Sequence, residues 1–390
     1  MTHLRCMVVD DSLVFRKVLR DCLAEVPNVE VVAVAGDGVV ALEKIRQFKP
    51  DFITLDLNMP VMDGLMVLDR LRNEGLDVEV LVVSSLTVDG AESSVRALSM
   101  GALDVLLKPS DPDMRKCVEQ LSLQLNDRVA VIMNRRNRRG SVRPTAVPTN
   151  SPQASLASPR SGALGVNAPP SPVSPVSASV RRPNQLINRA SADIAVIGIS
   201  TGGPAALQKL LPALPSSLSV PVVIVQHMPK TFTASLARDL DAKCALRVKE
   251  AVHGDLLVPG IVYIAPAGSQ SKIIRKHGAS LIEVNDDPPV RSCKPSVDYL
   301  FRSAASEYGS RTLGVIMTGM GNDGTEGAAL IRAAGGQIIA QDEASCTIYG
   351  MPKAAVESGA VNYILSLEEI SIAISRASGA ASVLAEMVRA

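Results

Sequence analysis

The chain has 390 residues, 40 basic and 39 acidic side chains for a net charge of +1, 47% hydrophobic residues and 3% aromatic residues. The length predicts two domains with connections. The balanced charge and scarce aromatics argue against nucleic acid as a partner, and no apolar run approaches the roughly 18 residues of a membrane helix. The six scattered cysteines, with no C-x-x-C pair, are typical of reduced thiols in a cytoplasmic protein.

Five apolar runs in the first third of the chain alternate with segments of helical periodicity. They read "CMVVDD", "VEVVAVA", "DFITLD", "VEVLVVSS" and "ALDVLLKP". A β-α repeat of this kind predicts an α/β fold with a doubly wound parallel sheet, whose functional site lies at the carboxyl ends of the strands.

The composition then changes, and residues 128–190 are predicted to be a disordered linker rich in Pro, Ser and Arg. Between residues 140 and 190 there is no acidic, lysine or aromatic residue, so this stretch cannot bury enough apolar surface to order itself. We expect domains at 1–127 and 191–390 on either side. The run "RRNRR" at 135–139 is interpreted as a solvated helix end rather than a nucleic-acid patch.

Polar side chains end four of the five predicted strands of the first domain. Asp10 and Asp11 follow the first strand, Asp56 ends the third, Ser84 the fourth and Lys108 the fifth. Converging carboxylates repel and need a cation, and oxygen ligands suit Mg²⁺. With a lysine and a hydroxyl beside them, these groups predict a pocket that forms and holds an aspartyl phosphate. The alternative is that strand-end acids merely cap helices.

Residues 4 to about 127 resemble response-regulator receiver domains in the motifs "VVDDS", "DLNMPVMDG", "VSS" and "KP". The resemblance implies a flavodoxin-like fold, with Asp56 as the acceptor of a phosphoryl group from a histidine kinase. It implies Ser84 and Lys108 as switch residues. Val105 takes a position that is often aromatic in that family. The implied magnesium ligands are Asp10, Asp11, Asp56 and the backbone carbonyl of Asn58.

After the linker, the strand runs "DIAVIGI", "VPVVIVQ", "TLGVIMT" and "GQIIA" predict a second α/β domain. Helices are expected after Pro204, after Thr231, over 296–308 and after Asp323. The segment 244–284 is richer in short strands and turns. We therefore expect a mostly parallel, doubly wound sheet with an antiparallel addition.

Three polar residues follow predicted strands of this second domain. Ser200 lies in the Gly-x-Ser-x-Gly turn of "AVIGISTGGP", where a bend would present its hydroxyl at a helix N-terminus. His227 follows the next strand, and Asp323 follows "LGVIMTGMGN". Together they match a nucleophile, a base and an orienting acid. The chain order Ser, His, Asp differs from that of α/β-hydrolases. Alternatively, Ser200 is a turn residue and His227 caps a strand. Asp323 could also cap a helix, a role compatible with that of an orienting acid.

Residues 191 to about 388 resemble the catalytic domain of chemotaxis protein-glutamate methylesterases, the CheB family, in "GISTGGP", "QHMP", "PSVDYLFRSAA", "MTGMGNDG" and "YGMPKAA". The resemblance implies that glutamate methyl esters on methyl-accepting chemoreceptors are hydrolysed and certain glutamines deamidated, in two-component chemosensory adaptation. It implies the triad Ser200, His227 and Asp323, no cofactor in this domain, and an oxyanion hole formed by the backbone amides of Thr201 and Met320.

Phosphorylation at Asp56 is expected to control the activity, because an unphosphorylated receiver packed on the triad face would block a helical receptor. Two other functions remain open on the sequence. The second domain could only bind a partner, with Ser200 as a turn residue. It could also hydrolyse an ester on another protein or on a small molecule.

Overall fold

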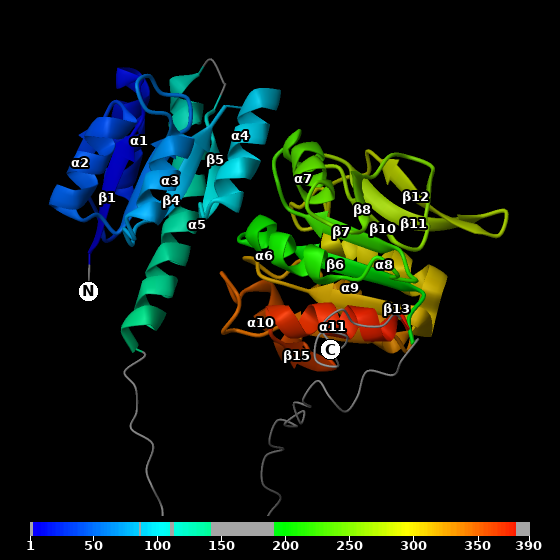
Figure 1. Cartoon of the computed structure of the whole chain (residues 1–390). Helices are drawn as coiled ribbons and strands as arrows, with labels where there is room; N and C mark the ends of the chain where they lie inside the picture. Colours follow the sequence, from blue (N-terminus) through cyan, green and yellow to red (C-terminus); the bar gives the residue numbers. More distant parts are fainter. Residues whose placement is uncertain (1–2, 86, 110–112, 142–190, 380–390) are drawn as a thin grey trace, which may run out of the picture.

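The structure is a computed structural model that describes residues 3–85, 87–109, 113–141 and 191–379. It contains two α/β domains, formed by the residues before and after the expected linker (Figure 1). No helix in these ranges is both long and apolar enough to cross a bilayer.

The first domain is a five-stranded parallel sheet with the strand order β2-β1-β3-β4-β5, the flavodoxin-like order that the sequence predicted. Its strands are β1 Leu4–Val9, β2 Val29–Ala35, β3 Phe52–Asp56, β4 Glu79–Ser84 and β5 Asp104–Leu107. Its helices are α1 Leu13–Glu25, α2 Gly38–Phe48, α3 Gly64–Asn73, α4 Val88–Ser99 and α5 Met114–Ser141. One core lies under α1 and α5, and the other lies under α2, α3 and α4.

Helix α5 is longer than the sequence suggested, since residues 128–141 of the expected linker are helical. The cause is packing, because Val129 and Ile132 are buried in the same core as the earlier turns of this helix. Arg135 pairs with Glu79 at 3.0 Å, and Arg136 pairs with Asp51. Two arginines of the basic run thus lie against acids of their own domain. The rest of the predicted linker, 142–190, lies outside the described residues.

The second domain has a seven-stranded sheet in the order β15-β14-β13-β6-β7-β10-β8, and every strand pair in it is parallel. Its strands are β6 Ile194–Ile199, β7 Val222–Gln226, β8 Arg247–Glu250, β10 Ile261–Ile264, β13 Thr312–Ile316, β14 Gln337–Gln341 and β15 Tyr363–Leu365. The chain runs from β6 toward β7 on one side and returns to β13 on the other. This reversal places the switch point of the sheet beside β6.

The expected antiparallel addition is a separate sheet of three strands, in the order β11-β12-β9. These strands are β9 Asp255–Leu256, β11 Gln270–Lys276 and β12 Ala279–Asn285. A two-residue turn joins β11 to β12, with positive φ at His277 and Gly278. Such a turn matches the twist of a hairpin, which explains why this segment pairs with itself.

Helices cover both faces of the main sheet. Their bounds are α6 Gly203–Leu210, α7 Phe232–Asp241, α8 Val297–Tyr308, α9 Thr325–Ala333, α10 Met351–Glu357 and α11 Leu367–Ala377, with short 3-10 turns at Leu211–Ala213 and Gly309–Arg311. One core lies under α6, α7 and α11, and the other lies under α8, α9 and α10.

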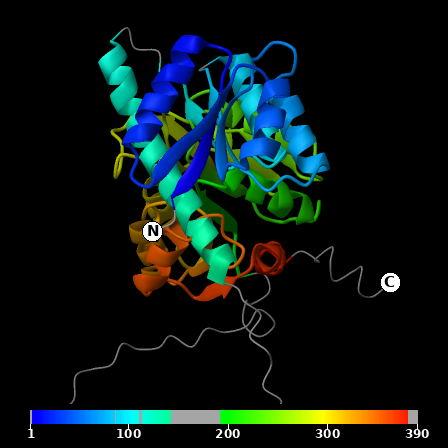
Figure 2. The ribbon, with the colours of Figure 1, turned by 90° about the vertical axis from the view of Figure 1, so that its left-hand side faces the viewer.

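The first domain rests on the second through α4, which lies beside α6 and α7 (Figure 1). Val95 of α4 packs into the core of the second domain, and Phe232 and Met228 pack against the core of the first. A view from the side shows α5 passing along the second domain toward its C-terminal half (Figure 2). Ile348 there packs against the core under α1 and α5. The two domains therefore share apolar contacts at two places.

Candidate active site

Ser200 lies at a sharp turn between β6 and α6 that requires glycines. Gly202 has φ +77°, and a Cβ there would lie 2.4 Å from the Thr347 side chain. A Cβ on Gly319, which follows β13, would lie 2.7 Å from the Cβ of Ser200. The glycines around Ser200 thus allow the left-handed turn and the close approach of two strand ends. This requirement accounts for the pattern around "GISTGG".

The backbone of Ser200 is held on both sides. Its amide donates to the carbonyl of Thr318 at 3.0 Å, and its own carbonyl accepts from the Gln226 side-chain amide at 3.0 Å. The hydroxyl of Ser200 makes no hydrogen bond within the described ranges, His227 included. The serine is thus fixed in position, with its oxygen available to a substrate.

His227 and Asp323 form a hydrogen-bonded pair beside this serine. Nε2 of His227 lies 2.9 Å from Oδ2 of Asp323, and the Asp323 carboxylate is almost fully buried. The structure thus brings together His227 and Asp323, which the sequence analysis assigned to one site. The two residues meet near Ser200 because β6, β7 and β13 are neighbours in the sheet. Ser200, His227 and Asp323 follow these strands at the same edge.

The N-terminus of α8 holds the Asp323 carboxylate. Asp323 accepts hydrogen bonds from the amides of Val297 at 2.7 Å and Asp298 at 3.0 Å, and from the Ser296 hydroxyl at 2.9 Å. It does not cap the helix that follows it, since α9 begins after Gly324 without a side-chain cap. The helix-cap alternative at α9 is therefore wrong, and the amides of another helix fix the acid.

These contacts shift both pKa values of the pair. Burial alone would raise the pKa of Asp323, but hydrogen bonds from His227 and the α8 amides lower it. Burial alone would lower the pKa of His227, but hydrogen bonds with Asp323 and Cys293 raise it to about 9. The acid is therefore ionised at neutral pH, while the histidine holds its proton until the pH approaches its pKa.

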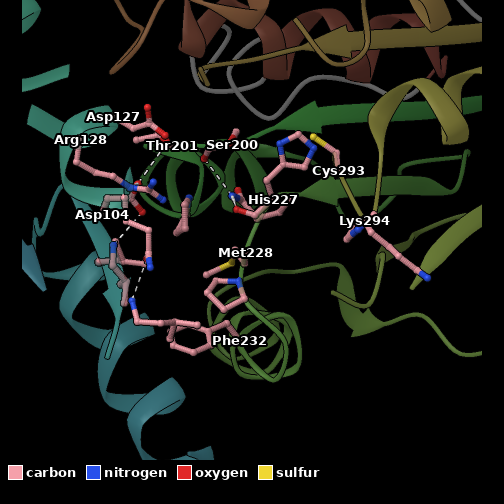
Figure 3. Close-up of a pocket in the computed structure, with 18 of the residues that line it drawn as sticks. Asp104, Asp127, Arg128, Ser200, Thr201, His227, Met228, Phe232, Cys293 and Lys294 are labelled. Carbon is pink, nitrogen blue, oxygen red and sulfur yellow. Dashed lines mark hydrogen bonds and ion pairs between the residues drawn. The ribbon is translucent and has the colours of Figure 1, made fainter. Parts of the chain in front are cut away.

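Cys293 is one residue of this site that the sequence analysis did not name. Its sulfur lies beside the His227 ring (Figure 3). It belongs to the loop that leads into α8, next to the motif "KPSVDY". The sequence contained no periodic or spacing signal for it, because 66 positions separate it from His227 along the chain.

A cavity of about 490 Å³ opens in front of Ser200 and is lined by both domains (Figure 3). The first domain contributes Asp104 and Arg128, among others. The Thr201 hydroxyl donates to Oδ2 of Asp104 at 3.3 Å, and Arg128 lies 3.3 Å from the same oxygen. A residue of β5 therefore contacts the neighbour of Ser200 directly.

The amides of Thr201 and Met320 donate to no acceptor within the described ranges. Thr201 follows Ser200 at the start of the turn into α6, and Met320 follows Gly319, which approaches Ser200 closely. Two amides without acceptors beside a serine and near a helix N-terminus can bind a developing negative charge.

The structure brings together Asp10, Asp56 and Lys108 of the predicted acidic pocket. Lys108 Nζ lies 2.8 Å from Asp10 and 2.7 Å from Asp56, and both carboxylates are buried. Asp11 is exposed, and one oxygen each of Asp10, Asp11 and Asp56 lie within 4.8 Å of one another. The backbone amide of Asn58 donates to Oδ1 of Asp56 at 3.3 Å. Burial alone would lower the pKa of Lys108, but its hydrogen bonds to Asp10 and Asp56 raise it.

Ser84, at the end of β4, makes its hydrogen bonds to backbone carbonyls and none to Lys108 or Asp56 within the described residues. Its buried hydroxyl donates to the carbonyl of Gly90, in the first turn of α4, at 3.2 Å. The strand that ends beside Asp56 is thus bonded to the helix that packs on the second domain. In the described conformation Ser84 therefore links the acidic pocket to the domain interface.

Comparison with known proteins defines the class. The family model of the response regulator receiver domain matches residues 6–119, and that of the CheB methylesterase matches residues 195–374. The chain therefore joins a receiver to a methylesterase domain.

The protein-glutamate methylesterase/protein-glutamine glutaminase of Desulfotalea psychrophila is 42% identical over 95% of this chain and 97% of its own length. Protein-glutamate methylesterase/protein-glutamine glutaminase 1 of Oleidesulfovibrio alaskensis is 40% identical over 96% of this chain and 99% of its own length. The crystal structure of the Thermotoga maritima CheB methylesterase catalytic domain is 41% identical, with a TM-score of 0.46, and covers 47% of this chain and 97% of that one. This chain belongs to the CheB family of protein-glutamate methylesterases/protein-glutamine glutaminases.

Proposed function

We propose that this protein hydrolyses glutamate methyl esters, and deamidates glutamines, on methyl-accepting chemoreceptors under the control of receiver phosphorylation. The names of full-length relatives support the substrate class. The observation that carries the proposal is the position of Ser200, at a glycine turn whose cavity also contains His227, bonded to the buried Asp323. A nucleophile, base and orienting acid in this arrangement perform acyl transfer.

In the proposed reaction, His227 accepts the proton of the Ser200 hydroxyl as its oxygen attacks the ester carbonyl. Asp323 orients the ring and stabilises its charged form. His227 then gives the proton to the leaving methanol. Water, activated by the same histidine, releases the carboxylate from Ser200. A glutamine would follow the same path, with ammonia as the leaving group.

The oxyanion of each tetrahedral intermediate would be bound by the amides of Thr201 and Met320. The absence of acceptors for these amides in the described ranges supports this role. A donor of this kind commonly contributes about 3 kcal/mol to the transition state. The Thr201 side chain, in contrast, contacts Asp104 of the receiver.

Asp56 is the proposed phosphoacceptor, and Lys108 neutralises phosphoryl oxygens beside it. The carboxylate oxygens of Asp10, Asp11 and Asp56 are hard donors and fit Mg²⁺. Asp11, the exposed member, leaves this cluster open to solvent. Bound magnesium would neutralise charge on the phosphoryl group. The ligands would be Asp10, Asp11, Asp56 and the carbonyl of Asn58.

The receiver is proposed to inhibit the second domain by covering it. Residues of β5 and α5 line the cavity in front of Ser200, where a receptor helix would need to enter. Phosphorylation would attract the Ser84 hydroxyl away from Gly90 and disturb α4. Since α4 packs on α6 and α7, this change would shift the population toward an uncovered state.

The proposed partners follow from this scheme. A histidine kinase supplies the phosphoryl group, and methylated receptors supply the ester. The six cysteines are scattered along the chain with no C-x-x-C pair, which supports a cytoplasmic location, where thiols stay reduced.

Methanol release from methylated receptor membranes tests this proposal, with the full-length protein compared with Ser200→Ala. We expect release by the wild type and a loss of about 10⁴-fold or more in the variant. If the variant releases methanol at the wild-type rate, Ser200 is a turn residue. If the wild type hydrolyses small esters but not the receptor esters, the substrate class is wrong.

A further inference from the structure

Cys293 completes a cluster of metal-binding side chains at the edge of the triad. A ring nitrogen of His227, the sulfur of Cys293 and a carboxylate oxygen of Asp323 lie within 4.8 Å of one another. Ligands bound to one zinc ion lie about 3 to 4 Å apart, because Zn–N, Zn–O and Zn–S bonds measure about 2.0 to 2.3 Å. The three atoms therefore need only a small closure to share one ion.

The loop that carries Cys293 is well ordered by its own contacts. The backbone amide of Cys293 donates to the carbonyl of Val290 at 2.8 Å, and the Cys293 carbonyl accepts from the Val290 amide at 3.1 Å. The buried Gln270 side chain donates to the same carbonyl at 3.2 Å. Arg291 and Ser292 have φ values of +50° and +63° within this turn. These contacts hold the backbone of Cys293, so binding a metal would need to order only its short side chain.

The donor set selects the kind of metal. One nitrogen, one sulfur and one oxygen suit zinc and similar thiophilic divalent cations, and a thiolate is a poor ligand for Mg²⁺ or Ca²⁺. The receiver cluster of Asp10, Asp11 and Asp56 offers only oxygens and has the opposite preference. The same chain thus presents a hard-ion site and a soft-ion site.

We propose that a thiophilic divalent cation of the zinc class binds His227, Cys293 and Asp323 and reversibly inhibits the esterase. Cys293 loses its thiol proton and His227 loses a ring proton, both to solvent, and the thiolate sulfur and the freed nitrogen lone pair then bind the metal. The ring can then no longer accept the Ser200 proton, and Asp323 no longer orients it. Three protein ligands leave a fourth position for water. The ion acts here as an inhibitor and takes no part in ester hydrolysis.

Binding can be measured without the esterase reaction, by titrating the full-length protein with Co²⁺, which takes zinc sites. Thiolate ligation produces a sulfur-to-cobalt charge-transfer band in the near ultraviolet. We expect this band in the wild type and in Cys244→Ser, a control at a half-buried cysteine elsewhere, and its loss in Cys293→Ser and Cys293→Ala. A wild type without the band, or variants at Cys293 that retain it, would overturn the site.

Inhibition rests on the proposed function and is measured as methanol release at buffered Zn²⁺ concentrations. Each variant is compared with itself in the presence of a chelator. Loss of one ligand should raise the Zn²⁺ concentration for half-inhibition by at least about tenfold in Cys293→Ser, but not in Cys244→Ser. Equal half-inhibition in all three proteins would overturn the inhibitory role. The cobalt band remains interpretable even if the receptor ester is not the substrate.

Discussion

The receiver pocket and the triad both place a carboxylate against a nitrogen at the carboxyl ends of parallel strands. Asp56 lies 2.7 Å from Lys108, and Asp323 lies 2.9 Å from His227. The pKa of Lys108 is raised further from neutrality, so this nitrogen stays charged. The pKa of His227 is raised to about 9, within reach of physiological pH. Similar geometry therefore serves two purposes, since a lysine holds charge and a histidine can move a proton.

The surroundings of the Asp56 and Asp323 carboxylates also differ in how open they are to solvent. Asp56 belongs to an oxygen cluster that has an exposed member in Asp11. Asp323 is enclosed by the N-terminus of α8, whose amides donate to both of its oxygens. An acid proposed to accept a phosphoryl group needs an opening to solvent beside it, and Asp11 is the exposed neighbour of the buried Asp56. An acid that orients a base needs a fixed position.

The largest effect is expected from Asp323→Asn, which keeps the shape of the side chain but removes its charge. The His227 ring would lose the partner that stabilises its protonated form, so methanol release should fall by about 10⁴-fold. Asp193→Asn is the control, since Asp193 is exposed and pairs with Arg311 at the opposite end of β6. A loss below tenfold in Asp323→Asn would contradict the proposed triad.

Lys108→Ala tests the nitrogen that lies beside the proposed phosphoacceptor Asp56. Coupling between two sites commonly changes an activity by roughly 5- to 150-fold, and we expect stimulation by a phosphodonor in this range for the wild type. The variant should lose it, with a ratio of stimulated to basal methanol release near one. Lys17→Ala, at an exposed lysine of α1, should keep the wild-type ratio. Full stimulation of Lys108→Ala would show that this lysine does not hold the phosphoryl group.

Asp104→Ala removes the hydrogen bond between the receiver and Thr201. A bond of this kind contributes roughly 0.5 to 1.5 kcal/mol, so uncovering should raise basal methanol release roughly 2- to 10-fold without phosphodonor. Glu92→Ala removes an ion pair with Arg238 in which both side chains are more than half exposed. It should change the basal rate by less than about twofold. A larger effect of Glu92→Ala than of Asp104→Ala would reverse this ranking of interface contacts.

The smallest effect concerns pH. Because hydrogen bonds raise the pKa of His227 to about 9, kcat/KM should increase as the pH rises toward that value and the ring loses its proton. The stability from this pairing is complete below the ordinary histidine pKa and is lost as the pH rises through about 9. Cys293→Ala, assayed with a chelator, should move the midpoint of the kcat/KM profile to lower pH. An unchanged or higher midpoint would show that Cys293 does not act on His227.

Much of this molecule follows from sequence pattern alone. The strand runs of both domains and the convergence of Asp10, Asp56 and Lys108 were predicted, because apolar runs fix the strands and parallel strands share one edge. The same reasoning predicted that His227 would meet Asp323. The catalytic and phosphoacceptor roles of these residues stay predictions that the experiments above address.

The features that sequence reasoning missed depend on contacts between distant segments. The burial of Val129 and Ile132 extends α5, the N-terminus of α8 holds Asp323, and a loop brings Cys293 to His227. The contact of Asp104 with Thr201 joins two domains. Such contacts depend on how completed elements pack, and local periodicity contains no record of that packing.

The central claim is that phosphorylation of the receiver uncovers the esterase site. The most direct measurement is methanol release from one preparation of methylated receptor membranes, before and after a small-molecule phosphodonor and Mg²⁺ are added, for wild type and Asp56→Asn. We expect release to rise in the wild type and to stay at its starting rate in the variant. Equal stimulation of both proteins, or none in the wild type, would contradict it.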